Sequence, residues 1–125
     1  MLCDTNILIY AADPADSHCV AFVERQDACI ASVTRIEVLG FPGWSKLSGD
    51  RSTRLEEIVA SMIQLPLNEA VIRFAIVLRQ QRKMTLGDSI IAATALAENL
   101  TLVTRNVDDF KHIAGLDLIN PFDTR

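Results

Sequence analysis

The stretch MLCDTNILIYAAD, residues 1–13, places one carboxylate between two apolar segments. Its first three residues have the composition of a short buried strand, and TNILIYAA (5–12) has the apolar spacing of a buried helix. Asp4 stands where this strand ends and the helix begins. A charged group at a buried junction is unfavourable unless it has partners, so Asp4 is the first candidate functional residue.

The composition predicts one folded domain over residues 1–125, because 50% of the residues are hydrophobic and 22% are charged. The apolar runs are too short to span a membrane and no leader precedes them, so we expect a cytoplasmic protein with no membrane contact. Cys3, Cys19 and Cys29 are odd in number and have no CxxC spacing. We interpret them as small buried hydrophobic residues, not as a disulfide or zinc framework.

The net charge of −4 argues against a protein that holds nucleic acid by a broad basic face. An acidic chain can still act on nucleic acid if its carboxylates bind cations. The positions of the acids therefore matter more than their number.

Segments with strand composition alternate with segments of helical spacing along the whole chain. We expect strands at 1–3, 28–31, 64–67, 100–104 and 117–121, helices at 5–12, 17–26, 32–40, 50–63, 68–83 and 85–100, a loop at 41–50, and a helical turn or short helix at 106–113. Such alternation gives parallel strands joined by crossover helices. The predicted fold class is α/β, a three-layer α/β/α sandwich with a central parallel sheet of Rossmann-like type.

That architecture places the working crevice beyond the carboxyl ends of the strands, where helix N-termini also converge. Polar residues that follow a predicted strand or begin a helix there are Asp4, Thr34, Glu37, Asp88, Thr104, Asn106 and Asp108. Four separate parts of the chain thus bring oxygen ligands to one edge of the sheet.

Several of these residues also have a purely structural interpretation as helix caps. Asp4 is a good N-cap for the helix at 5–12, Ser17 is expected to cap the next helix, and Gly40 to close the third. The acids at 108 and 109 suit the first turn of a helix, where they complement its dipole.

Two further acids fit capping boxes: Glu37 with Thr34 in TRIE, and Asp88 with Thr85 in TLGD. Taken together, the acids favour a functional interpretation. Glu37 has apolar residues on both sides, where a carboxylate needs a partner, and Asp88 precedes a helix apolar enough to be largely buried.

If Asp4, Glu37 and Asp88 converge, their mutual repulsion must be relieved by a bound proton or by a divalent cation. Oxygen donors without histidine or thiolate partners select Mg²⁺ or Mn²⁺ over zinc. His18 and His112 lie in helix-start and late polar segments that do not support a zinc site. An ion held by carboxylates suits phosphate chemistry, because it polarises phosphoryl oxygens and lowers the pKa of an attacking water.

The pieces CDTNILIYA, SVTRIEVLG, GDSIIAATALAENLTLVTRNVDDF and LINP resemble the PIN-domain family, and within it the VapC-type toxins of bacterial toxin–antitoxin pairs. The likeness runs from end to end in the same order. It implies a ribonuclease whose acids bind Mg²⁺ or Mn²⁺. Carried over by position, the catalytic and metal-binding acids are Asp4, Glu37 and Asp88, with Thr5 and Thr104 as supporting hydroxyls.

The chain departs from part of the family after Thr104, where some members carry a fourth acid and this sequence has Asn106. The resemblance implies that Asn106 contributes to the metal shell and that Asp108, or Asp109 in its place, takes over the missing contact. Whether one ion or two bind stays open.

The resemblance also implies partners: an RNA substrate, a small antitoxin protein and a second copy of the chain in a homodimer. Arg105 is the basic residue expected nearest the substrate. Other cations available for phosphate contact are Arg79, Arg82, Lys83, Arg51 and Arg54, although the first three also suit a solvated helix end. For the loop aromatics Phe41 and Trp44 we favour a protein contact or local packing over RNA stacking.

Other functional classes fit less well. A phosphatase with an aspartate nucleophile needs a second Asp two residues after Asp4, where the chain has Asn6, and a receiver domain needs adjacent early acids and an Asp after the third strand. Two alternatives stay open: a PIN-fold scaffold that binds RNA or protein without catalysis, and a housekeeping RNA-processing nuclease.

Overall fold

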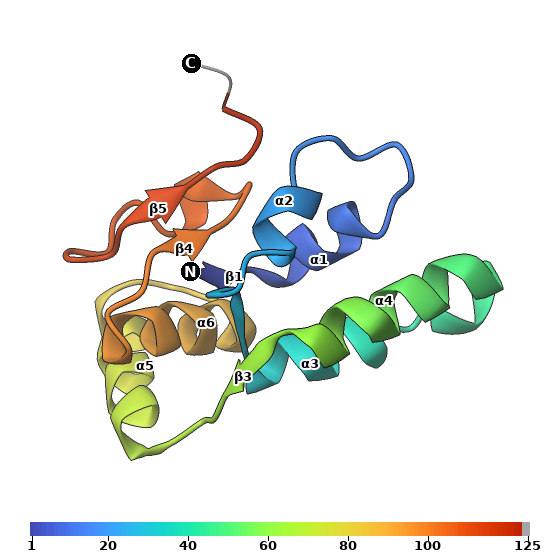
Figure 1. Cartoon of the computed structure of the whole chain (residues 1–125). Coiled ribbons are helices and arrows are strands. Elements are labelled where there is room, and N and C mark those ends of the chain that lie inside the picture. Colours follow the sequence, from blue (N-terminus) through green and yellow to red (C-terminus); the bar gives the residue numbers. More distant parts are fainter. Residues whose placement is uncertain (124–125) are drawn as a thin grey trace.

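The computed structural model describes residues 1–123 and contains a five-stranded parallel sheet with strand order β3-β2-β1-β4-β5 (Figure 1). The strands are β1 Leu2–Cys3, β2 Cys29–Ala31, β3 Ile63–Leu65, β4 Leu102–Val103 and β5 Leu118–Ile119. Every pairing is parallel, and Leu2 of the central strand is in register with Cys29 on one side and Leu102 on the other. The predicted α/β class with a central parallel sheet is confirmed.

Six α-helices and two short 3-10 helices connect the strands in the described part of the chain. They are α1 Thr5–Ala11, α2 Val20–Val23, α3 Ser32–Leu39, α4 Gly49–Ser61, α5 Glu69–Gln81 and α6 Leu86–Ala97, with η1 Trp44–Lys46 and η2 Val107–Asp109. Figure 1 shows α5 and α6 packed together, away from α1 and α2.

Two hydrophobic cores lie on the two faces of the sheet, because successive residues of a strand point to opposite sides. Cys3 and Val103 belong to the core that contains α1, α2 and α4. Leu2 and Leu102 belong to the core that contains α5 and α6. This division confirms the three-layer sandwich.

Helix α6 is buried nearly all round, as its apolar sequence predicts. Its residues from Ser89 to Ala95 are all buried, because α6 contacts α5, α3 and β2. The hydroxyls of Ser89 and Thr94 donate to carbonyls one turn earlier in the same helix, so these polar groups are satisfied inside the core. The helix therefore holds its first turn rigidly against the sheet.

The prediction for residues 17–26 was wrong in both extent and cap. Only Val20–Val23 are helical, and Ser17 does not cap them. The carboxylate of Asp16 accepts from the amides of Cys19 and Val20 instead. Asp16 thus binds the amides at the start of the helix.

Two other boundaries shift by a few residues. Helix α4 begins at Gly49 with the hydroxyl of Ser48 as its cap, and the loop before it contains η1. The third strand is Ile63–Leu65, not 64–67. Pro66 has no amide to donate, so it ends the strand at this edge of the sheet. Asn68 and Thr85 cap α5 and α6 through their side chains.

The three cysteines are free and buried, as predicted. Burial raises the pKa of the Cys3 and Cys19 thiols to about 12, so both stay protonated. In the described residues, the helices are all too short or too polar to cross a membrane.

The two phenylalanines Phe110 and Phe74 give a test of the core assignment. Phe110 is 1% exposed in the α5–α6 core, whereas Phe74 is 42% exposed on the outer face of α5. We expect Phe110→Ala to lower the free energy of unfolding by about 3–5 kcal/mol, because it leaves a large cavity. Phe74→Ala should change it by less than about 1 kcal/mol. Urea denaturation measures both, and equal losses would contradict the packing described here.

Candidate active site

Asp4 is buried at the end of β1 and makes hydrogen bonds with both carboxylate oxygens. It is the N-cap of α1, where Oδ1 accepts from the amide of Thr5 at 2.8 Å. Its Oδ2 accepts from the hydroxyl of Thr104 at 2.9 Å, and the residue is 5% exposed. Asp4 therefore does cap its helix, but capping uses only one of its two oxygens.

The Thr104 hydroxyl connects the ends of two neighbouring strands. It follows β4, is fully buried, donates to Asp4 and accepts from the backbone amide of Asn106 at 3.0 Å. The main chain after β4 is thereby held close to Asp4, while the side chain of Asn106 is exposed. The structure thus brings Thr104 to Asp4 as predicted.

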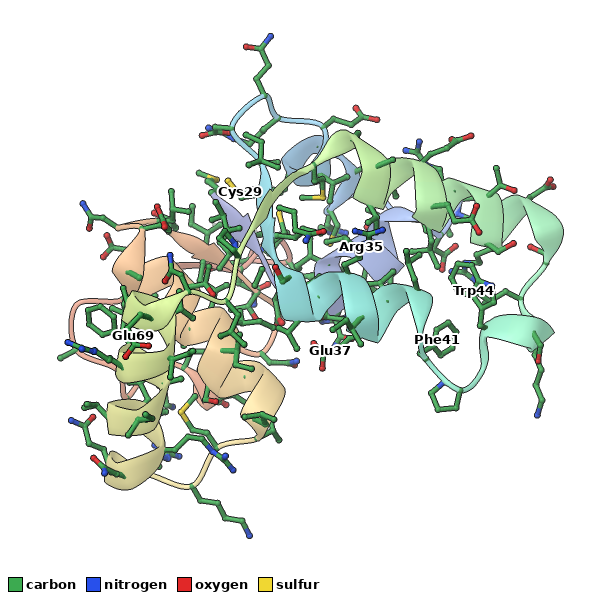
Figure 2. The ribbon with its side chains drawn as sticks, turned by 90° about the horizontal axis from the view of Figure 1, so that it is seen from below. Cys29, Arg35, Glu37, Phe41, Trp44 and Glu69 are labelled. Carbon is green, nitrogen blue, oxygen red and sulfur yellow. The ribbon has the colours of Figure 1, made fainter. Side chains whose placement is uncertain are left out.

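Glu37 lies on α3 and is connected to α1 by Thr5. The Thr5 hydroxyl donates to Oε1 of Glu37 at 2.7 Å and lies 3.3 Å from the buried hydroxyl of Thr34. Figure 2 shows Glu37 on the outer side of α3, before Phe41 and Trp44. Thr5 supports the site through Glu37, in addition to its amide contact with Asp4.

Two expectations about Glu37 were wrong. Helix α3 begins at Ser32 with Ala31 as its cap, so Thr34 is inside the helix and does not form a capping box with Glu37. Glu37 is exposed, and its neighbour Ile36 is 71% exposed, so the surroundings are not the apolar ones that the sequence suggested. Glu37 is nevertheless held in place by the hydrogen bond from Thr5.

Gly87 allows α6 to approach Glu37 closely. A Cβ atom at this position would lie 2.8 Å from Oε2 of Glu37. The next residue is Asp88, whose amide donates to the Thr85 hydroxyl at 3.1 Å, which confirms the predicted cap. The absence of a side chain at Gly87 therefore brings the carboxylate of Glu37 beside the first turn of α6, which carries Asp88.

The three acids affect one another electrostatically. Burial is the main reason why the pKa of Asp4 is raised to about 6, and the charges of Asp88 and Glu37 add to the increase. The pKa of Asp88 is raised by burial, then by the charges of Asp109 and Glu37, although Thr85 partly offsets this. The charges of Glu37 and Asp88 are therefore close enough to Asp4 to raise its pKa.

Of the two adjacent acids in η2, Asp109 is the one that faces Asp88. The two residues line the same hollow of about 340 Å³. Asp108 is 88% exposed at its side chain and pairs with Lys111 at 3.0 Å. The sequence analysis favoured Asp108 for the metal shell, whereas in the structure Asp109 lies in the hollow with Asp88.

The donor atoms available at this edge are carboxylate and hydroxyl oxygens, the ligands that Mg²⁺ and Mn²⁺ prefer. Within residues 1–123, no three His, Cys, Asp or Glu side chains are grouped closely enough to share one ion in their present positions. A cation beside Asp4 would offset the burial and repulsion that raise its pKa. The donor set therefore fits the chemistry of a hard divalent cation.

The basic residues divide into two groups. The sequence analysis named Arg51 and Arg54 as cations available for phosphate contact. In the structure, Arg51 pairs with Asp13 at 3.1 Å and Arg54 with Glu24 at 3.6 Å. Arg105 follows Thr104 and places its guanidinium 4.0 Å from the centre of the Phe122 ring. This stacking holds Arg105 beside the site, and no acid within residues 1–123 forms an ion pair with it.

The loop aromatics pack against each other, with ring centres of Phe41 and Trp44 6.2 Å apart and nearly perpendicular. Trp44 also packs against the core that contains α1 and α4. Local packing, which the sequence analysis favoured, is observed.

Sequence reasoning missed Gly87 and Phe122. The signal for Gly87 was a glycine in the first turn of an otherwise strong helix former, which often marks a close approach. Phe122 gave no local signal, because its contact with Arg105 depends on where β5 ends.

The PIN domain family is matched by residues 1–116 of the chain. Among curated proteins, Ribonuclease VapC2 of Rickettsia felis is 28% identical over 126 residues and covers 94% of each chain. Among solved structures, a toxin–antitoxin complex from Klebsiella pneumoniae is 29% identical, with a TM-score of 0.79 and 98% of each chain covered. FitAcB from Neisseria gonorrhoeae is 26% identical, with a TM-score of 0.76 and 98% and 99% covered.

The raised pKa of Asp4 predicts an unusual dependence of stability on pH in metal-free solution. Asp4 ionises near pH 6 when folded and near 3.8 when unfolded, so the folded chain binds more protons in this window. Its contribution to the free energy of unfolding therefore falls as pH rises from about 4 to 6. Asp4→Asn should raise the free energy of unfolding at pH 8 by about 1–3 kcal/mol and change it little at pH 4. Urea denaturation in EDTA at both pH values measures this.

Asp27→Asn is the matched control, because Asp27 is exposed and a hydrogen bond from Arg25 lowers its pKa to about 2. Removing this carboxylate should not raise stability at pH 8. A parent and an Asp4→Asn variant with identical pH profiles would show that the folded environment does not disfavour the charge on Asp4.

Proposed function

Because the chain belongs to the PIN-domain family, we propose that it is a metal-dependent ribonuclease and the toxin of a type II toxin–antitoxin pair. The relative from Rickettsia felis is a ribonuclease of VapC type, and the similar structures are toxin–antitoxin complexes. The observation that carries the proposal is the buried Asp4, hydrogen-bonded by Thr104 and coupled to Glu37 and Asp88.

Asp4 and Asp88 would hold Mg²⁺ or Mn²⁺ directly, with Glu37 near the same ion. The bound ion supplies charge stabilisation at the phosphoryl oxygens and makes the attacking water more acidic. Thr104 and the Thr5 amide keep the Asp4 carboxylate fixed at the end of β1. The site is thus preorganised before substrate arrives.

Glu37 would orient the attacking water and accept its proton. Oε1 receives the Thr5 hydroxyl, whereas Oε2 faces Gly87 and receives no hydrogen bond from residues 1–123 in the side-chain positions of this structure. The exposure of Glu37 leaves this oxygen accessible to water. Oε2 is therefore the atom to which we assign the proton transfer.

The remaining contacts of the site come from the segment after β4. We propose that Asn106 and Asp109 complete the metal shell, and that Asp108 contributes less because it pairs with Lys111. Arg105 would contact the RNA, since its stacking on Phe122 leaves it without an acidic partner in the described chain.

The partners follow from the same family membership. A small antitoxin protein is supported by the similar toxin–antitoxin complex from Klebsiella pneumoniae. A homodimer is supported by the exposed apolar side chains of α5, namely Ile72, Phe74, Ile76 and Val77. A non-catalytic scaffold is less favoured because all three acids are present and coupled, and an RNA-processing nuclease would use the same residues.

Cleavage of a panel of structured RNAs by the purified protein tests the activity. We expect cleavage with Mg²⁺ or Mn²⁺, none with EDTA, and a loss of at least a hundredfold in Asp4→Asn and in Asp88→Asn, because each removes an oxygen ligand charge. Asp50→Asn, an exposed acid in the first turn of α4, should cut like the parent. If cleavage does not depend on the metal, or if both variants cleave as well as the parent, the scaffold is favoured.

Gly87→Ala tests the placement of Glu37 without removing any functional group. The added Cβ meets only the end of the Glu37 side chain, so the fold should be kept while the carboxylate moves. We expect cleavage to slow by about ten- to a hundredfold, the effect of a misplaced catalytic group. The melting temperature should stay within a few degrees of the parent.

Gly49→Ala is the control for this substitution, because a Cβ at Gly49 meets nothing within 4 Å and the residue also begins a helix. It should leave cleavage unchanged. Full activity of Gly87→Ala would mean that the position of Glu37 beside α6 does not matter.

A further inference from the structure

Ion pairing separates the basic residues of this acidic chain into two groups. Arg25, Arg51, Arg54, Arg73 and Lys111 each lie within 4 Å of a carboxylate oxygen. Within residues 1–123, six cations form no such pair: Arg35, Lys46, Arg79, Arg82, Lys83 and Arg105. The unpaired cations at 79–83 follow one another along the end of α5 and the loop after it.

The loop between α5 and α6 brings two of these cations to the candidate active site. Figure 1 shows the loop crossing from the end of α5 to the start of α6. Arg82 and Lys83 line the hollow of about 340 Å³ that also contains Asp88 and Asp109. Thus cationic and anionic side chains share one hollow while remaining beyond ion-pair distance.

We propose that Arg82 and Lys83 bind an RNA phosphate next to the one that is cleaved, so that the RNA backbone enters the site over the α5–α6 loop. This inference rests on the proposed ribonuclease function. A cation held by Asp4 and Asp88 would offset the negative charge of the hollow, so that an incoming phosphate would meet the positive charges of Arg82 and Lys83.

The helix dipole does not explain these two residues. Arg79 lies in the last turn of α5, where a cation complements the dipole. Arg82 lies just beyond the end of α5, where its backbone is extended with φ −160° and ψ 149°, and Lys83 follows it. Both side chains are exposed beyond the helix end, so their charges are directed to the hollow's rim and to solvent.

The position of Arg82 and Lys83 also explains how a chain with a negative net charge could bind RNA. A chain with net charge −4 cannot attract RNA through its average field. Arg25, Arg51, Arg54, Arg73 and Lys111 are paired with carboxylates, which weakens their attraction for RNA. Arg82 and Lys83, beside Asp88, form no ion pair within residues 1–123. RNA binding is therefore expected to be weak, salt-dependent and centred on this loop.

Binding of a fluorescent single-stranded RNA, measured by anisotropy in Mg²⁺, tests the proposal. A Glu37→Gln background slows cleavage while leaving Asp4 and Asp88 in place, and gel analysis checks that the probe stays intact. We expect the Arg82→Gln, Lys83→Gln double substitution to weaken binding roughly tenfold at low salt. The slope of log affinity against log salt should fall by about 0.7 for each phosphate that the variant no longer neutralises, equally for probes of two sequences.

Two control variants separate a phosphate contact from a general change in charge. Lys46→Gln removes a cation on η1, outside the hollow, and should leave affinity and salt slope unchanged. Lys83→Arg keeps the charge and should bind like the parent. Inorganic phosphate should compete only at high concentration, because a single contact is weak.

The outcomes distinguish this proposal from the ribonuclease proposal. If the parent cleaves RNA and the double variant binds with the same affinity and salt slope, the phosphate site is wrong and the nuclease stands. If Lys46→Gln weakens binding as much, charge alone explains the effect and the site is overturned. A parent that neither cuts nor binds RNA would overturn both.

Discussion

The hydrogen bond from Thr104 to Asp4 joins residues 100 positions apart and closes the edge of the sheet on which the site is built. It connects the end of β4 to the end of the central strand, and the same hydroxyl accepts from the chain that leads to η2. A buried carboxylate needs such partners, because burial otherwise favours its neutral form. Even so, the pKa of Asp4 stays raised to about 6, because burial and the charges of Asp88 and Glu37 outweigh these hydrogen bonds. The structure is thus less stable at this point than it would be with a neutral residue, which is the usual consequence of a preorganised site.

The fold was predictable because its signals are local. Short apolar segments alternate with segments of helical spacing, and right-handed crossovers leave few topologies for such a chain. The failures were local motifs that the tertiary structure overrides. TRIE has the letters of a capping box, but β2 runs directly into α3 at Ala31, so the helix begins two residues before Thr34. Ser17 is a residue type that often caps helices, but the amides of Cys19 and Val20 at the start of α2 donate to Asp16 instead.

The candidate site was predictable to the level of which residues gather, but not how they contact. Asp4 was identifiable from one strand-to-helix junction. The contact of Glu37 with α6 depends on Gly87, and no spacing rule connects residues fifty positions apart. The choice between Asp108 and Asp109 depends on a 3-10 turn, in which adjacent side chains point in different directions. A sequence pattern places both acids in the same turn and cannot say which of them faces Asp88.

The distribution of ion pairs fits the proposal that this acidic chain acts on RNA. Pairs such as Arg51 with Asp13 and Arg54 with Glu24 lie on α4 and its neighbours, where mutual neutralisation leaves little field. At the opposite side, Asp88 and Asp109 share a hollow with Arg82 and Lys83 but form no ion pair with them. A divalent cation held by Asp4 and Asp88 would reduce the negative charge of the hollow and so favour phosphate binding there. Under this proposal, metal binding and substrate binding would be coupled through charge.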